Sequence, residues 1–77
     1  MESLLSLREI SGLSQFSVAR KNGVPRVRLS LAETEQLQLT SEEQARIRTL
    51  LLRVIEARAL QLQAVLAQYR TEEEAAQ

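Results

Sequence analysis

The 77-residue sequence predicts an all-α fold in which three short helices precede one long helix. Both glycines and the only proline fall between Gly12 and Pro25, so the residues that interrupt helices are confined to the first third of the chain. From Ser41 onward apolar residues recur at helical spacing without a glycine or proline. The alternating leucines of residues 34–40 are too few for a strand, and we expect a loop there with Leu37 and Leu39 against the core.

Each short helix has its own start or stop signal. The first carries apolar residues at helical spacing and ends at Ser11-Gly12, since glycine readily adopts the left-handed C-terminal position; these residues are Leu4, Leu5, Leu7 and Ile10. Ser14 is a good N-cap for a second helix of about two turns, with Val18 and Ala19 inward, which Asn22-Gly23 ends. Pro25 suits the first turn of a third helix, because its fixed φ and missing N–H cost nothing there. Two short helices joined by a tight glycine turn form a helix-turn-helix arrangement.

The long helix is expected over residues 41–70, with Thr40 or Ser41 as N-cap and with Glu42 and Glu43 near its positive end. Residues 71–77 are expected to fray. One apolar stripe of this helix comprises Ile47, Leu50, Leu51 and Val54. A second stripe advances in alternating steps of three and four residues, as in a coiled coil, and comprises Leu52, Ile55, Ala59, Leu62, Leu66 and Tyr69.

Two apolar stripes predict two partners. We expect the first stripe to close over a helix-turn-helix unit formed by residues 1–40, and the second to pair with a second copy in a homodimer. A domain of this size is marginally stable alone, which favours a partner subunit. The alternative is one wide apolar face buried within the monomer.

Composition excludes several classes of function. Without cysteine or histidine the chain lacks the usual ligands of zinc and the usual catalytic dyads and triads, so we expect no metal, no cofactor and no enzymatic activity. Phe16 and Tyr69 are the only aromatic residues, which disfavours a base-stacking platform for RNA or single strands. No signal peptide or membrane-spanning run occurs, so we expect a soluble, cytoplasmic and nucleoid-associated protein without a membrane partner or a small-molecule ligand.

Charge is unevenly distributed in a chain that is neutral in total. Ten Lys and Arg residues balance ten Asp and Glu residues. Between Ile10 and Ala32 every charged residue is positive, namely Arg20, Lys21, Arg26 and Arg28. This local cationic face favours a polyanionic partner.

The pattern LRE…GLSQ…VA…GVPR..LS..E, spanning about residues 4–33, resembles the phage-repressor and Cro-like (lambda-repressor-like, XRE-type) helix-turn-helix DNA-binding proteins. The resemblance implies that Arg26, Val27 and Leu31 contact bases in the major groove, and Arg28, which lies beside them, is a further predicted base contact. It also implies that Gln15 approaches a phosphate, and that Arg8 and Glu33 pair as a structural clamp.

Further phosphate contacts are predicted for Ser14, Lys21, Ser30 and Thr34. Helix capping is the alternative role of Ser14, and solvation is the alternative for the others. Arg20 suits either role.

The expected function is therefore that of a sequence-specific double-stranded DNA-binding transcriptional regulator. A small homodimeric repressor on a near-palindromic operator is favoured, with half-sites about 34 Å apart. The alternatives are a protein-interaction module, or an antitoxin, whose C-terminal helix binds a partner protein. Arg26-Val27-Arg28 on an outward face favours DNA, because a pure interaction module has no need of this cationic face.

Overall fold

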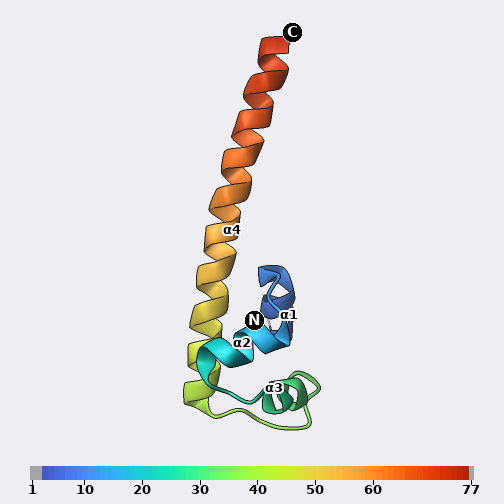
Figure 1. The fold of residues 1–77 in the computed structure, drawn as a ribbon, viewed down its shortest axis with the longest axis vertical. Helices are drawn as coiled ribbons and strands as arrows, with labels where there is room; N and C mark the ends of the chain where they lie inside the picture. The colour runs from blue at the N-terminus through green and yellow to red at the C-terminus, as the bar shows by residue number, and fades with distance from the viewer. Residues whose placement is uncertain (1–2, 77) are drawn as a thin grey trace.

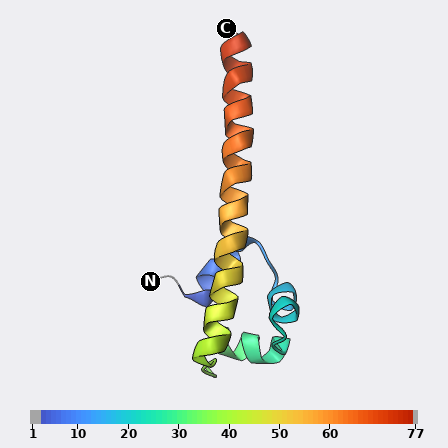
Figure 2. The same ribbon diagram turned by 90° about the vertical axis from the view of Figure 1, so that its left-hand side faces the viewer.

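The computed structural model describes residues 3–76, which form four α-helices and no strand. These helices are α1 (Leu4–Ser11), α2 (Gln15–Asn22), α3 (Arg26–Glu33) and α4 (Ser41–Ala76). The three short helices gather around the first part of α4, and the rest of α4 projects away from them (Figure 1). The view turned by 90° has the same arrangement (Figure 2). The predicted all-helical class with a long C-terminal helix is confirmed.

The predicted ends of α1 and α2 are confirmed, because their signals are local. Gly12 ends α1 with φ 78° and Gly23 ends α2 with φ 65°, both in the left-handed region that favours glycine. At the start of α2 the Ser14 hydroxyl accepts a hydrogen bond of 3.1 Å from the backbone N–H of Ser17. Ser3 caps α1 in the same way, through the N–H of Ser6.

The connection from α3 to α4 is a loop, as predicted. Leu39 is buried in it and Leu37 packs partly against the core. At its end Thr40 and Glu43 cap each other. The N–H of Glu43 donates to Thr40 Oγ1 at 3.1 Å, and the N–H of Thr40 donates to Glu43 Oε1 at 2.9 Å. This reciprocal capping box fixes the start of α4.

Residues 71–76 are helical, beyond the expected end of the long helix at residue 70, and the fraying of residues 71–77 stays a prediction. Helix α4 continues to Ala76, and residue 77 lies outside the described range. Thr71 Oγ1 donates to the carbonyl of Ala67 at 2.9 Å, so this threonine does not disturb the helix. The alanines and glutamates that follow are good helix formers, and no glycine or proline interrupts them.

A single core joins the head, which we define as residues 3–55. Its buried apolar side chains come from all four helices and the loop, and they are Leu7, Val18, Ala19, Leu29, Leu39, Ile47 and Leu51. Burying one such aliphatic side chain contributes about 1.5–3 kcal/mol to folding. At the end of α1, Ile10 is 52% exposed although it shares the apolar spacing of that helix.

The two apolar stripes of α4 have different surroundings. In the first stripe Ile47 and Leu51 are buried, and Leu50 and Val54 are half-buried. In the second stripe, which we call the seam, Ile55 packs partly against the core but Leu52, Ala59, Leu62, Leu66 and Tyr69 are exposed. The alternative of one wide face buried within the monomer is therefore wrong.

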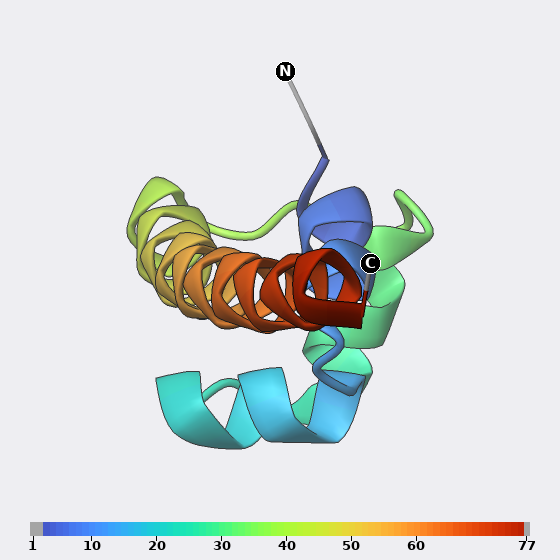
Figure 3. The same cartoon turned by 90° about the horizontal axis from the view of Figure 1, so that it is seen from above.

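From Glu56 to Ala76 every residue of α4 is exposed, and we call this stretch the free segment. No other helix runs beside it (Figures 1 and 2), and the view from above has its C-terminal end in front of the short helices (Figure 3). Within residues 3–76, none of the helices combines the length and apolar character that crossing a membrane requires.

Candidate nucleic-acid interface

The candidate interface is the exposed side of α2 and α3, which we call the α2–α3 surface. The two helices are joined by Gly23, Val24 and Pro25. Val24 is buried, and its N–H donates to the carbonyl of Ala19 at 3.0 Å. Because this apolar anchor lies in the middle of the turn, it holds α3 in a fixed position relative to α2.

The outward face of α3 is apolar at its centre and cationic at its edges. Val27 is 67% exposed and Leu31 is half-buried, while Leu29 is buried on the opposite side. At about 100° per residue, Val27 and Leu31 lie next to each other, and Arg26 and Arg28 flank Val27 on either side. The start of α3 also lacks a side-chain cap, since Pro25 at the N-cap makes no capping hydrogen bond. Its first backbone N–H groups form the kind of helix N-terminus that favours an anion.

Arg28 is held by α4 rather than extended from the surface. Its Nε donates to Glu43 Oε2 at 3.0 Å and its Nη2 donates to Glu43 Oε1 at 2.7 Å. The hydrogen bond from Arg28, with those from Thr40, lowers the pKa of Glu43 to about 2. This two-point pair ties α3 to the start of α4. Arg28, for which base contact is predicted above, therefore has an ion-pair partner that was not predicted. The sequence signal for this pair is the Thr40-to-Glu43 capping-box spacing, which fixes the glutamate at the start of α4.

Arg8 and Glu33 are brought together as a two-point ion pair between α1 and α3. Arg8 Nε donates to Glu33 Oε2 at 2.6 Å, and Arg8 Nη2 donates to Glu33 Oε1 at 3.0 Å. The remaining terminal nitrogen, Nη1, donates to the carbonyl of Leu13 at 3.1 Å. These bonds connect α1, the α1–α2 turn and the end of α3.

Gln15 adds a third helix to this cluster. Its Nε2 donates to Glu33 Oε1 at 2.7 Å, so the amide that is predicted to approach a phosphate is directed at a carboxylate. The Glu33 side chain is only 4% exposed. Burial alone would raise the pKa of Glu33, but the hydrogen bonds from Arg8 and Gln15, with the charge of Arg8, lower it below its usual value.

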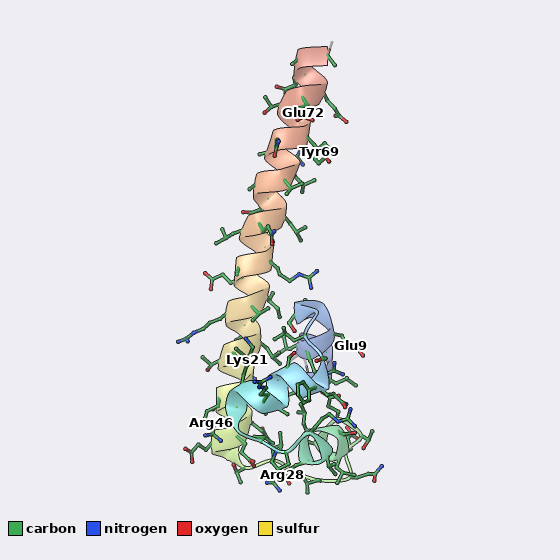
Figure 4. All side chains as sticks on the ribbon, in the orientation of Figure 1. Glu9, Lys21, Arg28, Arg46, Tyr69 and Glu72 are labelled. Carbon is green, nitrogen blue, oxygen red and sulfur yellow. The ribbon has the colours of Figure 1, made fainter. Side chains whose placement is uncertain are left out.

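The other predicted phosphate contacts differ in their exposure. Ser14 is occupied as the cap of α2, and Ser30 is half-buried. Thr34 is exposed, and its hydroxyl donates to carbonyls of α3. Lys21 is exposed on α2 (Figure 4), as is Arg20. The exposed cations of the α2–α3 surface are thus Arg20, Lys21 and Arg26.

Phe16 also belongs to this surface, although the sequence analysis did not assign it a site role. It lies on α2 and is 59% exposed. The sequence signal that places Phe16 on this surface is its position four residues before Arg20, since this spacing puts the two side chains next to each other on a helix.

Among residues 3–76, no group of three or more His, Cys, Asp or Glu side chains is placed to hold a metal ion. Comparisons of the chain with protein-family models, with curated proteins and with solved structures find no match. The assignment of function therefore depends on the exposure, charge and geometry of the residues described above.

Proposed function

We propose that the protein is a sequence-specific double-stranded DNA-binding transcriptional regulator that inserts the start of α3 into the major groove. The observation that carries the proposal is the exposure of Val27 beside Arg26 on a helix whose position is fixed on three sides. The fixed points are the anchor at Val24, the Arg8–Glu33 pair and the Arg28–Glu43 pair. A large apolar side chain on an outward, cationic face has no packing role in the monomer.

The chemistry of these side chains suits the edges of base pairs. Arg26 has the fork geometry to bind guanine O6 and N7 together, which typically contributes about 1–3 kcal/mol of discrimination. Val27 suits the methyl group of thymine. Arg20 and Lys21 on α2 suit phosphates, which position a protein on the duplex without specifying its sequence. Arg28 would have to leave Glu43 before it reached a base, so Arg26 is the primary residue for base recognition.

The seam of α4 supports a homodimer within this function. Leu62, Leu66 and Tyr69 are each more than half exposed. A dimer would present two α3 helices to an operator with two-fold symmetry, and its binding at a promoter would repress transcription by occlusion.

A second candidate function is the binding of a partner protein by α4, as in an interaction module or an antitoxin. The observation that favours it is the free segment, whose exposed apolar side chains are available to any partner with a complementary groove. Recognition of DNA by the head and of a protein by α4 are compatible.

The test is selection of binding sites from a pool of random duplexes at about 0.15 M salt, where non-specific phosphate binding is weakened. We expect the protein to enrich a motif with two-fold symmetry. Arg26→Ala should weaken binding to this motif by about tenfold or more and relax the preference at one base position, as expected for a lost bidentate contact. Arg53→Ala removes another exposed arginine, from α4, and serves as the matched control, with binding unchanged.

Two outcomes would contradict the proposal. One is a folded protein that enriches no motif, and the other is an Arg26→Ala variant that selects the same motif with the same affinity. Arg28→Ala is a poorer test, because it also breaks the pair with Glu43 and so changes stability.

A further inference from the structure

From residue 46 onward, α4 has an ordered distribution of charge. Residues 46–58 contain four arginines and one glutamate. Residues 59–69 contain no charged side chain, and residues 70–76 contain three glutamates and one arginine. The helix therefore has a basic section and an acidic end on either side of an uncharged stretch whose midpoint is residue 64.

We infer that α4 pairs with α4 of a second copy in the antiparallel orientation, with the two-fold axis near Ala64. The inference rests on the homodimer of the proposed function, but it does not depend on DNA binding. An antiparallel pair centred there sets the acidic end of each helix beside the basic section of the other. A parallel pair would set like charges together. Antiparallel helix dipoles also attract each other, whereas parallel dipoles repel.

Four of the six side chains of the seam pair with one another about the same centre. Exchange about residue 64 places Leu62 opposite Leu66 of the second copy, and Ala59 opposite Tyr69 of the second copy. The small alanine then leaves room for the large tyrosine in each of two layers, and facing positions of unequal size pack well. A parallel pair in register would put two alanines together in one layer and two tyrosines in another, leaving one layer underfilled and the other crowded.

The residues that flank the seam give a second, independent match. On one flank Glu56 approaches Arg70 of the second copy, and on the other flank Arg58 approaches Glu72 of the second copy. Two-fold symmetry repeats each pair, so four ion pairs border the seam. In the parallel register the flanking neighbours of Arg58 and Arg70 are Gln63 and Val65, which offer no opposite charge.

Arg58 is already positioned for this role by α1. Its Nη1 donates to the carbonyl of Ile10 at 3.3 Å, while the residue as a whole is exposed. A guanidinium has five N–H donors, so this contact leaves others for a carboxylate. The end of α1 thereby directs the arginine on one flank of the seam.

This orientation also places the two heads at opposite ends of the dimer. Ser41, where α4 begins, lies 23 residues from Ala64. At about 1.5 Å per residue, the two starting points are therefore about 70 Å apart. That span is close to two turns of duplex rather than one, so the half-sites of the operator should be about 20 base pairs apart, centre to centre.

The orientation can be measured by distances between spin labels in the absence of DNA. The native chain has no cysteine, so Glu74→Cys and Thr49→Cys each introduce a single label at an exposed position of α4. In the antiparallel dimer the distance between the two labels should be about 30 Å for residue 74 and about 45 Å for residue 49. Short and similar distances at both positions would establish a parallel pair and overturn the inference, and so would a monomer that gives no distance at either position.

Charge reversal gives a second readout. Arg70→Glu should weaken dimerisation by about tenfold, because it puts two glutamates together on each side of the axis. Adding Glu56→Arg to the same chain should restore the affinity. Arg53→Glu makes the same change in net charge away from the seam and should have little effect. Failure of the double variant to recover would contradict the register.

The two proposals fail separately. An antiparallel dimer that selects no DNA would remove the proposed function and leave the pairing intact. Selection of a single half-site by a monomer would do the reverse.

Discussion

Glu33 joins more of the head than any other single side chain described above. Its carboxylate accepts two hydrogen bonds from Arg8 and one from Gln15, and it is almost entirely buried. Three helices meet at these contacts, and α3 is the helix that is proposed to read DNA. A single carboxylate thus connects the stability of the head with the orientation of α3.

We expect Glu33→Gln to lower the free energy of unfolding by about 2–3 kcal/mol, because Arg8 would keep its charge in a nearly buried site without a carboxylate. For a domain of this size the melting temperature should fall by roughly 10 °C or more. Thermal unfolding followed by circular dichroism measures the change. Glu42→Gln removes an exposed carboxylate from α4 and is the control, with a much smaller shift expected. Equal melting curves for the two variants would show that the Arg8–Glu33 pair does not stabilise the head.

At the scale of the element, the helix ends were predictable because their causes are local. Gly12, Ser14 and Gly23 act through their own backbone or through a neighbour a few residues away. The Arg28–Glu43 pair was not predictable in the same way, because it depends on the approach of α3 to α4 across a loop. The continuation of α4 beyond Tyr69 was missed for a different reason. Fraying was expected because residues near a chain end are often poorly ordered, whereas glutamate and alanine are good helix formers.

Within α4, the two leucines of residues 60 and 62 provide a matched comparison. Leu60 is 63% exposed and Leu62 is 57% exposed, but only Leu62 belongs to the seam. Leu62→Asp should give a monomer in sedimentation equilibrium, because it places a charge in the centre of the dimer contact. Leu60→Asp should leave the dimer intact, since this residue lies on the other side of the helix. If both substitutions, or neither, prevented association, the seam would be assigned to the wrong face.

At the scale of the whole molecule, two ion pairs fasten α3 to the rest of the head. Arg8–Glu33 joins it to α1, and Arg28–Glu43 joins it to α4. Both carboxylates have a pKa below the usual value, to about 2 for Glu43. Because protonation of either group breaks a link between helices, acid should loosen the head as a unit.

The pH dependence follows from the sign of these shifts. A carboxylate whose pKa is lower in the folded state stabilises that state above its unfolded pKa, and the stabilisation is lost as pH falls toward the folded pKa. The melting temperature should therefore be nearly constant from pH 7 to about pH 5 and then decline toward about pH 2. The double variant Glu33→Gln, Glu43→Gln should melt at a lower temperature and have a shallower decline. A wild-type curve no steeper than that of the double variant would contradict these assignments.

The projecting α4 also governs how a single chain moves through solution. The molecule extends 56 × 21 × 19 Å, with a radius of gyration of 16.6 Å. A compact chain of 77 residues would have a radius of gyration of about 11–12 Å. Frictional drag on such a rod is greater than on a sphere of equal mass, so a lone chain diffuses slowly and leaves a size-exclusion column early. A monomer would consequently be mistaken for a dimer by its elution volume. Only a measurement of molar mass that does not depend on molecular shape distinguishes the two.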